Sequence, residues 1–122
     1  MLQDQLYVLK ECRVLDGTYE ARIELLPQSV IYSVHFPGMP VTPGACLVQI
    51  ACELASVAAG AKLELSSASD IRFLSPVLPS ECKEILASLS GETPQEEPSL
   101  WEVKMFEGET LCARMKLFLK RA

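Results

Sequence analysis

The stretch HFPGMPVTPGACLVQIACELA, residues 35–55, combines three side chains whose types could do acid–base chemistry. His35 is the only histidine in the chain, and an imidazole exchanges protons near neutral pH. Glu53 can deliver a proton, whereas the Gln49 amide can form hydrogen bonds but cannot deliver one. These residue types suit His35 to the role of a base and Glu53 to the role of an acid, with a purely structural histidine as the alternative.

A helix is predicted directly after the loop that carries His35. Thr42 suits the N-cap, Pro43 suits the first helical position, and Gly60 suits the position just past the end. Gly44 then lies in the first turn, at the positive end of the helix dipole, where its N–H has no partner within the helix. This N–H could bind a substrate carbonyl, or the glycine could serve only to allow close packing at the helix entry.

The predicted helix is apolar on almost every side, which indicates burial. Gln49, Glu53 and Ser56 are exceptions and form one narrow polar stripe. A buried glutamate is costly unless it has partners, and burial alone would raise its pKa, as a general acid requires. The alternative is that Glu53 pairs with a basic residue or reaches the surface.

The rest of the chain is predicted to be mostly strands. Alternating apolar residues in 18–25 and an Asp-Gly turn before them indicate a hairpin with 6–17, and residues 29–36 look extended. Further strands are predicted in 69–79, 82–92, 99–109 and 110–120. The sum is an α+β fold of one buried helix and five to seven mostly antiparallel strands, with an edge strand that dimerisation could cover.

Composition narrows the class of protein further. The 122 residues suggest a single domain, 1–122, and a net charge of −5 argues against a nucleic-acid partner. The five cysteines form no CxxC pair and there is one histidine, so no metal site is predicted and free thiols in a reducing cytoplasm are expected. No membrane span or signal peptide is recognised.

Two separate motifs resemble the β-hydroxyacyl-acyl-carrier-protein dehydratases of the hot-dog fold (FabZ/FabA-like). HFPGMPVTPGACLVQIACE resembles the family's helix-entry motif, and DIRFLSPVLPSE resembles its strand-and-turn motif. The resemblance implies a long central helix wrapped by a curved sheet. It also implies dehydration of a β-hydroxyacyl thioester to a trans-2-enoyl thioester, in fatty-acid or polyene-type biosynthesis.

The resemblance also implies roles for individual residues. His35 matches the catalytic histidine, and Gly44 matches the glycine expected to bind the thioester carbonyl. Gly38 and Met39 are expected on the substrate side of the loop, with Met39 lining the acyl chain. The family's catalytic glutamate falls on Gln49 and its following glutamine falls on Glu53, so these two residue types have changed places.

The resemblance implies acyl carrier protein as partner and no cofactor, since the substrate rides on the phosphopantetheine of carrier protein or coenzyme A. A homodimer or higher homo-oligomer is expected, with His35 facing Glu53 or Gln49 across the interface. Arg72 and Lys62 are candidates for a basic docking patch. Two alternatives stay open: a non-catalytic or partner-dependent subunit paired with a second hot-dog chain, and an acyl thioesterase or enoyl isomerase.

Overall fold

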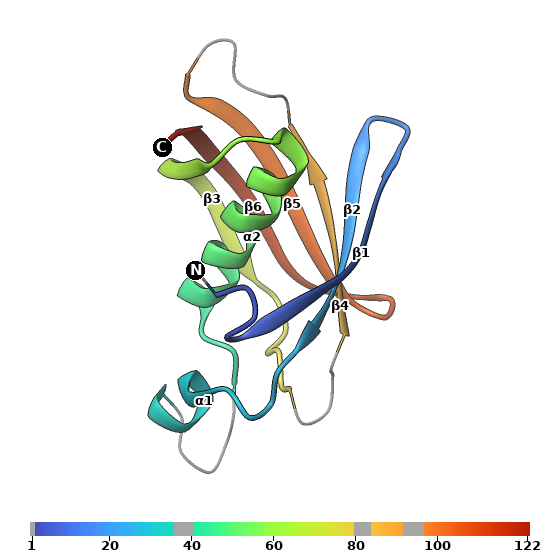
Figure 1. Cartoon of the computed structure of the whole chain (residues 1–122), viewed down its shortest axis with the longest axis vertical. Coiled ribbons are helices and arrows are strands. Elements are labelled where there is room, and N and C mark those ends of the chain that lie inside the picture. The colour runs from blue at the N-terminus through green and yellow to red at the C-terminus, as the bar shows by residue number, and fades with distance from the viewer. Residues whose placement is uncertain (1, 36–40, 80–83, 92–96) are drawn as a thin grey trace.

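The computed structural model describes residues 2–35, 41–79, 84–91 and 97–122, without the side chains of 33–35. In these residues one sheet curves around one long helix, α2 (Gly44–Ala59), as Figure 1 shows. The strands follow the order β1-β2-β4-β5-β6-β3, and every neighbouring pair is antiparallel. Their bounds are β1 Tyr7–Leu15, β2 Thr18–Leu25, β3 Leu63–Phe73, β4 Glu84–Ser90, β5 Ser99–Glu107 and β6 Thr110–Arg121. The predicted α+β fold with a helix wrapped by a curved antiparallel sheet is confirmed.

The core lies between α2 and the concave face of the sheet. The side chains that face α2 alternate along each strand, as in Ile85, Ala87 and Leu89 of β4, which are all buried. From α2 itself the buried residues are Leu47, Ile50, Ala51, Cys52, Glu53, Leu54 and Ala55. Glu53 is thus the one charged side chain of α2 in the core, and the fold must supply its partners.

The ends of α2 differ in how well the sequence predicted them. Gly60 ends the helix in the left-handed conformation, φ 69°, as expected. The start was misplaced by one residue, because Pro43 is the N-cap and no side chain caps the helix. Thr42 has other partners: its N–H donates to the Val77 carbonyl at 2.9 Å, and its hydroxyl forms a 2.9 Å hydrogen bond with the Tyr32 hydroxyl.

The predicted hairpins are confirmed. Asp16 (φ 49°) and Gly17 (φ 77°) form the turn between β1 and β2. Both central residues have positive φ, which is the geometry that matches the twist of paired strands. Farther across the sheet β5 and β6 form the second hairpin, with β3 beyond β6. These strands form part of the sheet against which α2 packs.

Two predicted elements need correction. Residues 29–36 were expected to be extended, but Val30–His35 form a short helix, α1. Ser29 starts it, because its hydroxyl accepts from the Ile31 N–H at 3.4 Å and its carbonyl accepts from the Tyr32 N–H at 3.2 Å. The strand expected in 69–79 starts earlier and ends earlier, as β3 Leu63–Phe73, because pairing with β6 extends it toward α2.

β3 is an edge of the sheet within the described part of the chain. It pairs with β6 on one side, and its register shifts at two places along the strand. Leu65 and Phe73 of β3 and Leu74 just after it are 42%, 51% and 53% exposed. An edge strand with exposed apolar side chains is a surface on which another chain can pair.

Candidate functional site

The structure places the predicted site residues on two neighbouring segments. Gly44 is the first residue of α2, and Gln49 and Glu53 follow on the same helix. His35 is the last residue of α1, and its side chain is outside the described part. Gly38 and Met39 lie outside the described residues. The arrangement of His35 relative to Gln49 and Glu53 therefore stays a prediction.

Four hydrogen bonds converge on the Glu53 carboxylate. Oε2 accepts from the Leu2 N–H at 2.8 Å and from Gln49 Nε2 at 2.9 Å. Oε1 accepts from the Gln3 N–H and from the Tyr7 hydroxyl, both at 3.0 Å. Glu53 is only 6% exposed, so this set satisfies a carboxylate that water hardly reaches. Neither sequence alternative, a basic partner or a surface position, describes this arrangement.

These partners keep Glu53 ionised. Burial raises the pKa of Glu53, but the hydrogen bonds from Leu2, Gln49, Gln3 and Tyr7 together outweigh burial and hold the pKa below its ordinary value. The sequence-based expectation of a raised pKa is wrong, because it counted desolvation and not the donors that the N-terminal segment brings. A carboxylate that is deprotonated near neutral pH has no proton to deliver as a general acid.

Two neighbours of Glu53 are kept neutral by the same surroundings. Burial and the charge of Glu53 raise the pKa of the Tyr7 hydroxyl well above its ordinary value. Burial, followed by the charge of Glu53, raises the pKa of the Cys52 thiol to about 11. Glu53 is thus the charged member of this group, and the groups around it serve as donors or as neutral packing.

The orientation of the Gln49 amide follows from the charge of Glu53. An ionised carboxylate only accepts hydrogen bonds, so the nitrogen of the Gln49 amide must face it. Among the described residues none donates to Gln49 Oε1. Gln49 lines a pocket of about 400 Å³ together with Glu53, Ser56, Val57, Gly60, Ala61, Lys62 and Leu63. This pocket is mostly apolar, and its polar or charged lining residues are Gln49, Glu53, Ser56 and Lys62.

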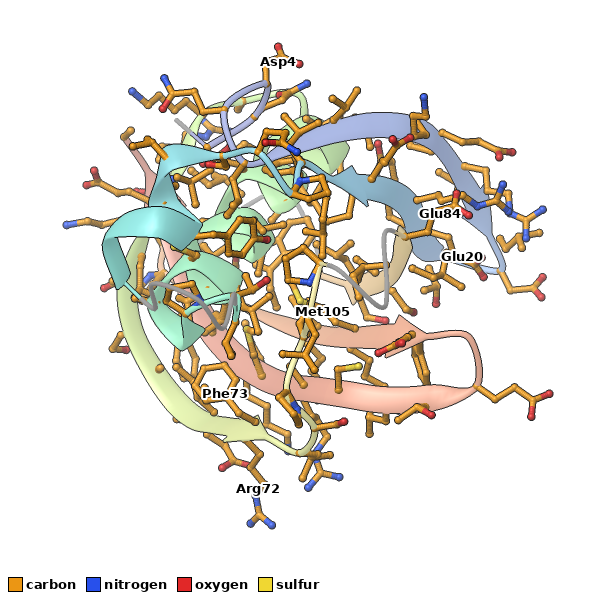
Figure 2. The ribbon with its side chains drawn as sticks, turned by 90° about the horizontal axis from the view of Figure 1, so that it is seen from below. Asp4, Glu20, Arg72, Phe73, Glu84 and Met105 are labelled. Atoms are coloured by element: carbon orange, nitrogen blue, oxygen red, sulfur yellow. The ribbon has the colours of Figure 1, made fainter. Side chains whose placement is uncertain are left out.

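A second pocket, of about 360 Å³, lies at the start of α2. Gly44 lines it with Phe73 of β3 and with Thr42, Ser75 and Val77. The Phe73 ring packs on Gly44 so closely that an added Cβ would lie 2.6 Å from a ring carbon. Figure 2 shows Phe73 on the concave side of β3 and its neighbour Arg72 extending away from the protein. Gly44 therefore has a packing role, and as the first residue of α2 it has an N–H without a partner inside the helix.

The two basic docking candidates lie near different pockets. Lys62 lines the pocket of Gln49 and is exposed. Arg72 precedes Phe73, and its guanidinium forms an ion pair with Asp70 at 3.3 Å, with 59% of its side chain exposed. That ion pair balances much of the charge that Arg72 could offer an acidic partner, so Lys62 is the better-placed cation.

Other kinds of site find little support in the described residues. No group of three or more His, Cys, Asp or Glu side chains there is arranged to hold a metal ion. The described cysteines, Cys12, Cys46, Cys52 and Cys112, are free thiols. Neither α1 nor α2 is long and apolar enough to cross a membrane.

Sequence reasoning missed the residues that surround Glu53. Leu2 and Gln3 contribute through backbone N–H groups, and nothing in their side chains signals that role. Tyr7 was visible only as part of a strand. The signal that could have found them is the cost of a buried glutamate, which requires several donors from elsewhere in the chain.

Comparison with known proteins agrees with this fold. The sequence pattern of the ApeI-like family, described as ApeI dehydratase, matches residues 11–114. The chain is therefore a hot-dog protein, and it belongs to the ApeI-like dehydratase family. No curated protein gave a significant sequence match.

Solved structures share the fold at low sequence identity. A chain of the dehydratase heterocomplex ApeI:P from Xenorhabdus doucetiae matches with a TM-score of 0.76 and 16% identity, covering 93% of this chain and 97% of that one. The uncharacterised protein PH1136 from Pyrococcus horikoshii matches with a TM-score of 0.69 and 20% identity, covering 99% and 88%. The putative thioesterase yhdA from Lactococcus lactis matches with a TM-score of 0.69 and 14% identity, covering 100% and 96%. At such identities the likeness supports the fold alone.

Proposed function

We propose that this chain is a subunit of a dehydratase that acts on β-hydroxyacyl thioesters carried by acyl carrier protein. In the reaction a base takes the α-proton, the bond from the β-carbon to its hydroxyl breaks, and an acid protonates the departing hydroxyl to give water and a trans-2-enoyl thioester. Membership of the ApeI-like dehydratase family and the helix-entry motif around His35 support this assignment.

The ionised Glu53 with its four hydrogen bonds is the observation that best supports a contribution other than that of the acid. Its carboxylate is already occupied by donors, and its pKa is held low. Gln49, at the position of the catalytic glutamate in the FabZ/FabA-like motif, has no acidic proton. The catalytic role predicted for Glu53 therefore gains no support, and the chain is proposed to supply the base but not the acid.

We assign the other roles by the motif and the pockets. His35 is the proposed base, and the Gly44 N–H the proposed donor to the thioester carbonyl as enolate character develops. Gly38 and Met39 are proposed to border the substrate on the loop after His35. The substrate is carried on a phosphopantetheine arm. Because a base, an acid and a donor to the carbonyl suffice for the reaction, no metal or cofactor is proposed.

A second hot-dog chain is the proposed source of the acid. A symmetric or pseudo-symmetric pair joined along β3 would run the two edge strands antiparallel. The Phe73 end of one β3 then lies beside the Leu63 end of the other. Because Phe73 lines the Gly44 pocket and Leu63 lines the Gln49 pocket, such pairing brings the first pocket of one chain to the second pocket of its partner.

This arrangement has a consequence for the number of active sites. In a pair with a partner that carries glutamate at the position of Gln49, His35 of this chain faces an acid. The other site of the same pair contains Gln49 and lacks one. We therefore propose one complete site per heteropair, whereas a homodimer of this chain would hold two incomplete sites. The solved ApeI:P dehydratase heterocomplex provides a precedent for two different chains.

The test is dehydration of a β-hydroxyacyl carrier protein by this chain co-expressed with a hot-dog chain that carries the glutamate. We expect enoyl thioester from the pair and at least 100-fold less from the pair with His35→Ala, as the loss of a general base predicts. Mass analysis separates an enoyl thioester from a hydrolysed free acid. Free acid as the main product, or full activity in His35→Ala, would contradict the proposal.

A further inference from the structure

The exchange of amide and acid on α2 raises the question of what Glu53 does if it is not the acid. Its four donors come from two places: one from Gln49 on the same helix, and three from the N-terminal segment, which we define as residues 2–7. We propose that Glu53 is a positioning residue, which fixes the N-terminal segment on α2 and turns the Gln49 amide so that its oxygen accepts the β-hydroxyl of the substrate.

The first step is that position 53 requires a carboxylate. Oε2 faces the Leu2 N–H and Oε1 faces the Gln3 N–H. A backbone N–H cannot reverse its polarity, so both side-chain oxygens must be acceptors. An amide offers one acceptor and one donor group, and it would leave one of these two N–H groups facing another donor. Glutamine, which the FabZ/FabA-like motif has here, does not suit this N-terminal segment.

The second step is that a carboxylate at position 53 requires a donor at position 49. Residues four apart on a helix lie on the same face, and Oε2 and Gln49 Nε2 are 2.9 Å apart. A second carboxylate there would place two negative charges in contact. Glutamine meets the requirement, and the acid–amide exchange is therefore one linked change that follows from the N-terminal segment.

The third step concerns the free half of the Gln49 amide. With Nε2 held by Glu53, Oε1 is on the opposite branch of the same planar group, and no described residue donates to it. Gln49 lines the 400 Å³ pocket, whose walls are otherwise mostly apolar. A fixed acceptor in an apolar pocket prefers a ligand with a hydroxyl over the same ligand without one, since only the hydroxyl satisfies it. This step rests on the proposed function for its choice of ligand, and it describes binding at the site that contains Gln49 and lacks an acid.

Nuclear magnetic resonance can test the first part without any ligand. In a ¹⁵N-labelled sample we expect the Gln49 side-chain NH₂ signals to shift on acidification as Glu53 takes up a proton. Tyr7 and Cys52 stay neutral throughout, since the pKa of each is raised. Asp4 lies near Tyr7, so Asp4→Asn is the control that should leave this shift unchanged. Persistence of the shift in Glu53→Gln would overturn the positioning role.

A matched pair of probes tests the second part: a β-hydroxyacyl pantetheine thioester and the acyl pantetheine thioester of equal length. We expect the protein to bind the hydroxylated probe about threefold to tenfold more tightly, as one hydrogen bond predicts. Gln49→Met, of similar size, should lose this preference, so that it binds the two probes with equal affinity. Glu53→Gln should weaken the preference, because the amide is then held less firmly.

The outcomes separate the two proposals. Equal affinity for both probes in the unaltered protein would overturn the hydroxyl acceptor while leaving an acyl-thioester function in place. Failure to bind either probe would contradict the proposed function and the assigned ligand, while the resonance experiment would still decide whether Glu53 positions Gln49.

Discussion

The hydroxyl of Tyr7 donates a 3.0 Å hydrogen bond to Glu53 across 46 residues of sequence. This contact fixes the start of β1 against the middle of α2, and in Figure 1 the N-terminus lies beside that helix. Glu53, which sequence analysis predicted to be the acid, is thus a main attachment point of the N-terminal segment. Glu53 thus contributes to the stability of the fold and to the geometry of the site, and mutations can measure each contribution.

Glu53→Gln should destabilise the protein by about 1–3 kcal/mol, because one partly buried backbone N–H loses its acceptor. Urea unfolding monitored by circular dichroism measures the change. Glu64→Gln is the matched control, since Glu64 forms an exposed ion pair with Lys120 at 3.7 Å and should change stability by less than about 0.5 kcal/mol. Equal effects of the two variants would show that the contacts of Glu53 carry no special weight.

Acid should weaken the protein through Glu53. Its pKa in the folded chain is below the ordinary value of 4.5, so it binds protons less readily when folded than when unfolded. Its contribution to stability is complete above pH 4.5 and is lost as the pH falls through the folded-state pKa. We expect the free energy of unfolding to fall less steeply in this acidic range for Glu53→Gln. Parallel curves for both proteins would contradict the assignment.

Gly44→Ala tests the contact with Phe73. The added Cβ would lie 2.6 Å from the ring, but the ring is at the end of a side chain in a half-exposed residue and can move. We expect a loss of up to about 1 kcal/mol in the unaltered background, and a gain of about 0.5–1 kcal/mol in a Phe73→Ala background, where only the helix preference of alanine remains. A double-mutant cycle by urea unfolding measures both values. The same cost in both backgrounds would mean that the ring is not the obstacle.

Much of the fold could be predicted because its signals are local. The alternation in β2 and β4, the Asp16–Gly17 turn and the Gly60 helix end each depend on a few neighbouring residues. α1 was missed because Val30 and Ile31 favour strands, whereas Ser29 and the burial of Tyr32 favour the helix. Short segments of this kind are decided by contacts outside them.

The site was predictable in position but not in chemistry. The motif located His35, Gly44, Gln49 and Glu53, and the helix period placed the last two on one face. The sign of the pKa shift of Glu53 could not be predicted, because it depends on backbone N–H groups about 50 residues away in the sequence. Hydrogen bonds from the main chain leave no residue-type signal for sequence analysis to detect.

The central claim is that this chain lacks its own acid because Glu53 is committed to positioning Gln49. The most direct measurement is dehydration of a β-hydroxyacyl pantetheine thioester by this chain alone, compared with Gln49→Glu and the control Gln49→Met. In Gln49→Glu two carboxylates would be in contact, and Glu53 keeps its other three donors, so the new glutamate should hold a proton with a raised pKa. We predict at least a tenfold gain in enoyl product for Gln49→Glu, falling as the pH rises, and none for Gln49→Met. Turnover by the unaltered chain as fast as by Gln49→Glu, abolished in a folded Glu53→Gln, would contradict the account.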